Sequence, residues 1–396
     1  MIVMLLGVLS LLGCAGEPAT SVPDPERPGS TATPLGAESI EPLLAALVAD
    51  WTDPTAWAAH IDSTDDGFAR RAEFLRGNFA QFELTMTPAG RTAPLSPARQ
   101  EVLGPTAVVH AVRIDWAAPG QAPATHEIWF TVTRAEGRLR WAGTSDGPSS
   151  APGPVPLWLR HPVDVEAGNG STVIATRGVD PAPWLTALET ARQHLVAHDL
   201  DPGPITVQLP GDPADFNAVL GIREGSHHAV AASTMPFGAT AHIVINPRVG
   251  GSLAEKPRQV LLTHEAVHVV TGPLPASVPL WFSEGYADFV ALADHPDVLA
   301  AHEKHLADDQ RRHGVGTTLV SDRELSPDHP RIDAHYQRAW LTVRVLDRGD
   351  GTADRVHAAV RGGKSLEDAL AVAGWSEQSL TVAVQDELAR LVDEIP

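Results

Sequence analysis

Apolar positions in the first 148 residues change from helical to alternating spacing. Helical spacing comes first and forms two apolar faces: Leu43, Leu44, Leu47 and Val48, then Phe68, Ala72, Leu75 and Phe79. Alternating or β-branched runs follow at 82–87, 107–116, 127–134 and 139–144, and the last two flank Glu136-Gly137. This order predicts helices packed on a curved antiparallel sheet that ends in a hairpin.

The rest of the chain begins with strand patterns and continues as helices. Strand patterns occupy 163–176, 205–209 and 241–246, and an amphipathic helix is expected over 183–198. From about residue 254 to the C-terminus the apolar spacing is mostly helical. We therefore predict a small sheet followed by a helical body, so that both halves belong to the α+β class.

Proline and glycine mark the expected boundaries. The segment 149–156 reads Ser-Ser-Ala-Pro-Gly-Pro-Val-Pro, which predicts a linker between a domain over 37–148 and a domain over 157–396. Residues 14–36 contain five prolines among small and polar residues and have almost no apolar side chains. That composition predicts a disordered tether.

The N-terminus carries a short apolar run that ends at a cysteine. Residues 1–13 are too few to cross a bilayer, which takes about 20, but they suit the apolar region of a signal peptide. Leu11-Leu12-Gly13-Cys14 resembles the lipobox of bacterial lipoproteins, in which the cysteine sulfur is lipidated. We expect an extracytoplasmic protein with its lipid anchor at Cys14. The chain departs from that pattern in having no basic residue before the apolar run, and the alternative is a plain secretory signal in which the cysteine occurs by chance.

Composition excludes several kinds of site. The formal net charge of -20 argues against nucleic acid as a partner and against charge-driven binding to an anionic membrane, because both need a basic face. Cys14 is the only cysteine, so neither an intrachain disulfide nor a thiolate zinc cluster can form. A bound metal would have to be held by histidines and carboxylates.

One segment has the spacing of a zinc site on a helix. His264-Glu265-Ala266-Val267-His268 lies in a helical pattern that stops at Gly272-Pro273. Residues four apart share a helix face, so His264 and His268 can direct two imidazoles at one Zn²⁺ ion. Glu265 lies beside them, where a general base can take a proton from water that the metal activates. The alternative is a pair of surface histidines on an ordinary amphipathic helix.

A second helix pattern follows at once. It is expected over 277–290, with Ser277 as the N-cap. Glu284 lies one to two turns into this helix and can face the metal as a third ligand. Asp288 is four residues further on and can accept the distal N–H of a ligating histidine. Three protein ligands with an open fourth position are the arrangement of a catalytic zinc site.

These two segments resemble the gluzincin peptidases, and more narrowly the bacterial peptidase MA-like domains. Those domains have H-E-x-x-H followed by Pro-x-Trp-x-x-Glu-Gly-x-Ala, and residues 279–287 match the second motif. The likeness is tight over 260–290 and extends plausibly over 155–396. The resemblance implies a thermolysin-like zincin domain with Glu265 as the base and Glu284 as the third ligand. It also implies that Asp288 is the hydrogen-bond partner of a ligating histidine. The preceding domain resembles the NTF2-like cone in the order and length of its elements.

The resemblance also suggests residues that would act on a peptide or protein substrate. In that family an edge strand upstream of the zinc helix pairs with the substrate backbone, and 241–246 is the expected strand. Tyr336 or His335 could donate a hydrogen bond to the developing oxyanion. Packing alone is an equal alternative for Tyr336 and the favoured one for His335.

Four polar residues of the first domain have two possible interpretations. They could line a pocket of the cone, but polar positions on a solvated sheet face are the favoured interpretation. The four are His110, Asp115, His126 and Glu127.

The leading hypothesis is therefore an extracytoplasmic zinc metallopeptidase that hydrolyses peptide bonds with Glu265 as general base. The alternative is a latent or inactive lipoprotein that uses the zincin fold as a scaffold for binding or assembly, because fold does not fix function.

Overall fold

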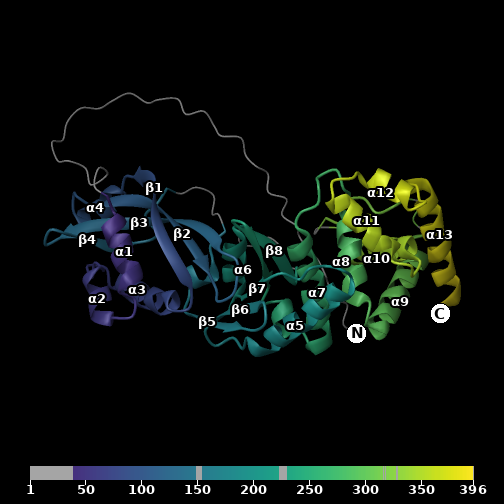
Figure 1. Cartoon of the computed structure of the whole chain (residues 1–396), viewed down its shortest axis with the longest axis horizontal. Helices are drawn as coiled ribbons and strands as arrows, with labels where there is room; N and C mark the ends of the chain where they lie inside the picture. Colours follow the sequence, from purple (N-terminus) through teal and green to yellow (C-terminus); the bar gives the residue numbers. More distant parts are fainter. Residues whose placement is uncertain are drawn as a thin grey trace, which may run out of the picture.

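The structure is a computed structural model that describes residues 39–148, 154–222, 230–314, 316, 318–326 and 329–395. The expected signal peptide, Cys14, the expected tether and residues 149–153 of the expected linker lie outside this range. In the range that is described, no helix has the length and apolarity needed to cross a membrane. Figure 1 shows three parts in sequence along the long axis: a sheet with its helices, a second sheet, and a helical body.

The first part combines four helices with an antiparallel sheet in the order β1-β2-β3-β4. The predicted hairpin is confirmed, because Ala135 pairs with Arg138 across Glu136 and Gly137, which have φ of 52° and 78°. The elements are α1 (Glu41–Ala49), α2 (Pro54–Ala59), α3 (Asp66–Phe79), β1 (Glu83–Ala93), α4 (Pro97–Leu103), β2 (Val108–Ala117), β3 (Ala124–Ala135) and β4 (Arg138–Gly143).

The second sheet has five strands in the order β5-β6-β7-β9-β8. Its three middle strands are parallel, and each outer strand is antiparallel to its neighbour. The strands are β5 (Val163–Ala167), β6 (Ser171–Thr176), β7 (Ile205–Leu209), β8 (Ala232–Phe237) and β9 (Thr240–Ile245).

The expectation that 241–246 forms the edge strand is wrong. This segment is β9, which lies between β7 and β8, so β8 is the edge among the described strands. The two strands form a hairpin in which Phe237 pairs with Thr240 across a two-residue loop. Pro236 interrupts the strand pattern of β8, as is typical of an edge strand, and this hid the strand in the sequence.

Helices build the rest of the chain and confirm the α+β class. Helix α7 contacts β8, β9, α5 and α8, and α8 also packs on α10. A Cβ at Gly285 would lie 2.3 Å from the carbonyl oxygen of Ala339, so only glycine permits this approach of α8 to α10. The helices are α5 (Ala182–Ala197), α6 (Pro213–Leu220), α7 (Glu255–Thr271), α8 (Leu280–Leu292), α9 (Pro296–His313), α10 (Ile332–Asp347), α11 (Thr352–Arg361), α12 (Leu366–Val372) and α13 (Glu377–Glu394).

The first part and the second sheet share one apolar core. Trp158, in the short 3-10 turn Leu157–Leu159, contacts Phe79, Phe82 and Trp116 with ring centroids 5.6–5.9 Å apart. The same cluster includes Phe237 of β8. The predicted division into domains stays a prediction, but the described residues on either side of 149–153 pack as one body.

Candidate metal centre

The ends of α7 and α8 place the candidate ligands opposite each other. Helix α7 stops as expected at Gly272, which has φ of 65° and donates its N–H to the carbonyl of His268 at 3.0 Å. Helix α8 begins at Leu280, so the expectation that Ser277 caps it is wrong. Asp322 accepts the N–H of Leu280 at 2.8 Å instead, and this cap comes from a distant segment that local sequence does not reveal.

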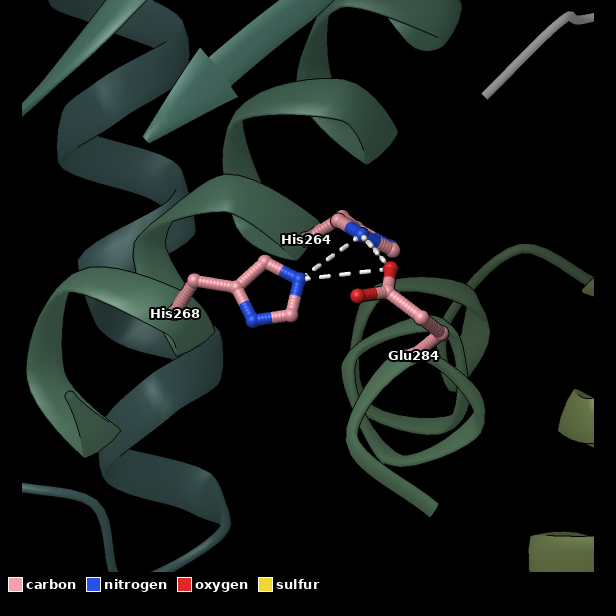
Figure 2. A group of neighbouring side chains, drawn as sticks. All are labelled: His264, His268 and Glu284. Carbon is pink, nitrogen blue, oxygen red and sulfur yellow. Dashed lines mark hydrogen bonds and ion pairs between the residues drawn. The ribbon is translucent and has the colours of Figure 1, made fainter. Parts of the chain in front are cut away.

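Three buried donor atoms converge between these two helices. Figure 2 shows His264 and His268 on α7 facing Glu284 on α8. The Nε2 atoms of His264 and His268 are 3.1 Å apart. Oε2 of Glu284 lies 3.4 Å from Nε2 of His264 and 3.5 Å from Nε2 of His268. Because all three side chains are buried, the alternative of two surface histidines is wrong.

The size of this triangle fits a metal ion. A tetrahedral ion with bonds of about 2.0–2.1 Å spaces its ligand atoms about 3.3–3.4 Å apart. The observed separations of 3.1–3.5 Å match one face of such a tetrahedron and leave its fourth corner to another ligand. The group can therefore bind a metal, and two imidazoles with one carboxylate suit a transition metal better than Ca²⁺ or Mg²⁺.

Asp288 fixes the orientation of the first imidazole. Its Oδ1 lies 2.7 Å from Nδ1 of His264, and both side chains are buried. With the ring proton on Nδ1, Nε2 keeps its lone pair for a metal. Burial alone would lower the pKa of His264, but the carboxylates of Asp288 and Glu284 outweigh it and raise that pKa to about 10. The site thus strongly favours a positive charge at this point.

Glu265 is completely buried and is held by one side chain. The hydroxyl of Thr234 on β8 donates to its Oε2 at 2.8 Å, whereas its Oε1 has no hydrogen-bond partner. Burial raises the pKa of Glu265, against the opposing effects of His264, His268 and Thr234. A buried carboxylate with one oxygen hydrogen-bonded and the other unpaired can accept a proton at the unpaired oxygen.

The structure places both candidate oxyanion donors at the start of α10. Tyr336 is buried in the core shared by α7, α8 and α10, and its catalytic role stays a prediction. His335 is also buried, and neither of its ring nitrogens has a hydrogen-bond partner. Burial lowers its pKa to about 4 although Glu324 lies 3.6 Å from Nδ1, so the ring is neutral at physiological pH.

The four polar residues of the first sheet do not gather at one place. Asp115 is paired with Arg113, and Glu127 is paired with Arg91. His110 is buried in strand β2 and pairs in register with Phe130. His126 lies opposite Ile114, a core residue, and burial lowers its pKa to about 4. The ion pairs of Asp115 and Glu127 suit a solvated sheet face, but that interpretation is wrong for His110, whose Nε2 is buried without a hydrogen-bond partner. A pocket shared by the four residues has no support.

A second group could geometrically hold a metal but has another explanation. It consists of His161, Asp212 and Asp215. Asp215 already pairs with Nε of Arg160 at 2.9 Å and with His161 at 2.7 Å. Asp212 is the N-cap of α6 and accepts the N–H of Asp215. Ion pairing and helix capping therefore satisfy this cluster.

Thr234 is not among the residues predicted from the sequence, because strand β8 was not predicted. One signal was available: Gly238-Ala239 precedes the predicted strand at 241–246, and a two-residue loop containing glycine is typical of a hairpin. Extending that hairpin backwards would have produced a strand over 232–237.

No protein-family model, no curated protein and no solved structure matches the chain. The site therefore rests on its own geometry: a buried His-His-Glu group that could bind a metal, as in a metalloenzyme.

Proposed function

We propose that this chain is a zinc-dependent metallopeptidase that hydrolyses peptide bonds outside the cytoplasm. The observation that carries the proposal is the bare Oε1 of Glu265, a buried carboxylate oxygen on the helix that also supplies two ligands of the metal group. A site built only to hold a metal would need no such base. Structural zinc sites usually have four protein ligands, and the described residues supply three.

The residues divide the work of hydrolysis between them. His264, His268 and Glu284 would hold Zn²⁺, which when bound supplies a Lewis acid that polarises a carbonyl and activates water. Glu265 accepts the proton of the attacking water at Oε1 and then donates it to the leaving amine. Tyr336 remains the preferred donor to the oxyanion and His335 the second choice.

The edge strand β8 supports an extended peptide or protein as substrate. In a hairpin closed by a two-residue loop, the pair that flanks the loop exchanges hydrogen bonds and the pairs then alternate. From the pairing of Phe237 with Thr240, the main chains of Ala232, Thr234 and Pro236 point away from β9. Pro236 has no N–H and Ala232 is buried, so Thr234 supplies the outward donor for a peptide added by β-augmentation.

Finer assignments of fold and location belong to the same proposal. A gluzincin zincin domain is supported by the antiparallel edge strand followed by the helix that carries H-E-x-x-H and by the nearby glutamate helix. An NTF2-like cone is supported by three helices that precede an antiparallel sheet. We also propose a signal peptide, a lipid anchor at Cys14 and a position at the outer face of a membrane.

Metal content and proteolysis on one preparation test the function. We would purify the full chain with Glu265→Gln and His268→Ala variants, quantify zinc per chain, and assay cleavage of a mixed peptide library. We expect one zinc per wild-type chain. Cleavage should fall about 100- to 10,000-fold in Glu265→Gln with zinc retained, and both should be lost in His268→Ala.

The other outcomes lead to different conclusions. Zinc without cleavage of any peptide would favour the alternative, a lipoprotein that binds or assembles partners on this scaffold. Absence of any bound metal would contradict the proposed centre altogether.

A further inference from the structure

Thr234 joins two features of the site that lie far apart in the sequence. Its side chain reaches α7, where the hydroxyl lies 2.8 Å from Oε2 of Glu265 and 3.3 Å from the carbonyl oxygen of the same residue. A hydroxyl has one proton, and the shorter contact is the stronger hydrogen bond. The carboxylate accepts no other hydrogen bond from the described residues, because its Oε1 has no partner.

A carboxylate in this position needs such a partner. The terminal torsion of a glutamate side chain has a broad energy profile, so burial alone does not select which oxygen faces the reacting atoms. A hydrogen bond to one oxygen removes that freedom and leaves the other oxygen available. Proton transfer depends on geometry first, since the base must lie within hydrogen-bond reach of its proton.

We propose that Thr234 is a positioning residue that holds Oε2 of Glu265 so that Oε1 faces the attacking water. This inference rests on the proposed peptidase function and adds to it a residue outside the metal-binding helices. Glu265 moves the proton, and Thr234 acts through Glu265.

The place of Thr234 on β8 also connects the base to the substrate. Thr234 pairs with Ile243 in a position where its own N–H and C=O point away from β9. The strand edge that would receive the peptide backbone is therefore formed in part by the residue that orients the base. A peptide paired with this edge would order the main chain of Thr234, and with it the hydroxyl that holds Glu265.

Three variants test the proposal in the full chain loaded with zinc. Thr234→Val keeps the shape and removes the hydroxyl, and Thr234→Ser keeps the hydroxyl. Thr172→Val on β6 is the matched control, since the Thr172 hydroxyl is buried and has no hydrogen-bond partner. Steady-state cleavage, zinc content, melting temperature and a crystal structure of each variant are measured.

We expect kcat to fall about 10- to 100-fold in Thr234→Val with KM changed less than about threefold. Thr234→Ser should recover most of kcat, and Thr172→Val should match the wild type. Zinc content should be unchanged in all three. In the crystal structure of Thr234→Val, the carboxylate of Glu265 should adopt more than one orientation.

The measurements distinguish a wrong role for Thr234 from a wrong peptidase function. If the wild type cleaves and Glu265→Gln does not, but Thr234→Val has normal kcat or a single unchanged carboxylate orientation, Thr234 has no positioning role and the peptidase stands. Loss of zinc or folding in Thr234→Val without rescue by Thr234→Ser would make Thr234 merely structural. A wild type that cleaves nothing would overturn the peptidase and this role together.

Discussion

The two edges of the five-stranded sheet differ in whether other residues pair with their outward main chain. At the β5 edge, Asn78 and Gln81 accept the N–H groups of Val163 and Val165 at 3.0 Å. Gln81 also donates to the carbonyl of Val163 at 2.8 Å. At the β8 edge, the outward main chain of Thr234 has no partner strand among the described residues, and Glu265 lies directly beside it.

This difference separates an edge that is covered from one that is left uncovered by the described residues. An exposed strand edge invites pairing with another chain, and proteins usually cover it. Here two side-chain amides substitute for a further strand on β5. The β8 edge is short and has Pro236 as its next-to-last residue, which limits unwanted pairing, but Thr234 keeps an outward N–H and C=O near Glu265. An open edge beside Glu265 is the arrangement that the proposed binding of a peptide backbone requires.

Removing the amide that covers β5 should produce the largest effect on stability. Asn78 is fully buried and donates to the carbonyls of Trp158 and His161 at 2.7 Å each, besides accepting from Val163. Asn78→Ala leaves two buried backbone groups and one partly buried carbonyl unpaired, so the free energy of unfolding should fall by about 3–5 kcal/mol. Denaturant unfolding of the zinc-loaded chain measures it.

Gln81→Ala is the graded control for the β5 edge. Gln81 makes two of these bonds from a half-buried position, so a smaller loss of about 1–2 kcal/mol is expected. Zinc content should stay normal in both variants. An Asn78→Ala protein as stable as the wild type would show that the β5 edge needs no cover.

Local patterns predicted most of the fold, because most elements have uninterrupted periodicity. The sheet of the first part, β5 to β7, β9, and helices α5 and α7 all follow from apolar spacing and from turn residues such as Glu136-Gly137 and Gly272-Pro273. Strand β8 could not be found in this way, because Pro236 breaks its pattern and because edge pairing is a property of the sheet.

Local patterns also predicted some residues of the candidate site and missed others. The spacing of His264 and His268 on one helix predicts a shared face, and Glu284 and Asp288 follow at helical intervals on the next. Asp322 at the start of α8 and Thr234 at Glu265 act across 42 and 31 residues of sequence. No local pattern encodes such contacts, since they exist only once the helices and the sheet are packed.

The strand next to the open edge should make stability depend on pH. His242 of β9 accepts a hydrogen bond at Nδ1 from the side-chain amide of Gln208 at 3.0 Å and packs between Trp116 and Phe237. Burial lowers the pKa of His242 to about 3, below its ordinary value of 6.5. The unfolded chain therefore binds the proton first, and stability present above pH 6.5 is lost as the pH falls towards 3.

His242→Asn isolates this contribution, because its amide oxygen can accept the Gln208 hydrogen bond but does not titrate. Unfolding free energies measured between pH 7 and 5 should depend on pH less steeply in the variant, by about 1.4 kcal/mol per pH unit once the pH is well below 6.5. The comparison is made at equal zinc concentration. Equal slopes in the two proteins would mean that His242 accepts a proton in the folded state.

The smallest effect should come from the substrate side of the open edge. A peptide paired with β8 presents alternate N–H groups to the strand, so methylating one facing nitrogen removes one hydrogen bond, worth about 0.5–1.5 kcal/mol. Cleavage of a peptide series methylated at one backbone nitrogen at a time, away from the scissile bond, should show kcat/KM reduced about 2- to 10-fold at every second position. Neighbouring positions, whose N–H points away, are the internal control. Equal losses at successive positions would contradict pairing with β8, whereas the period of two would identify this edge as the one that binds substrate.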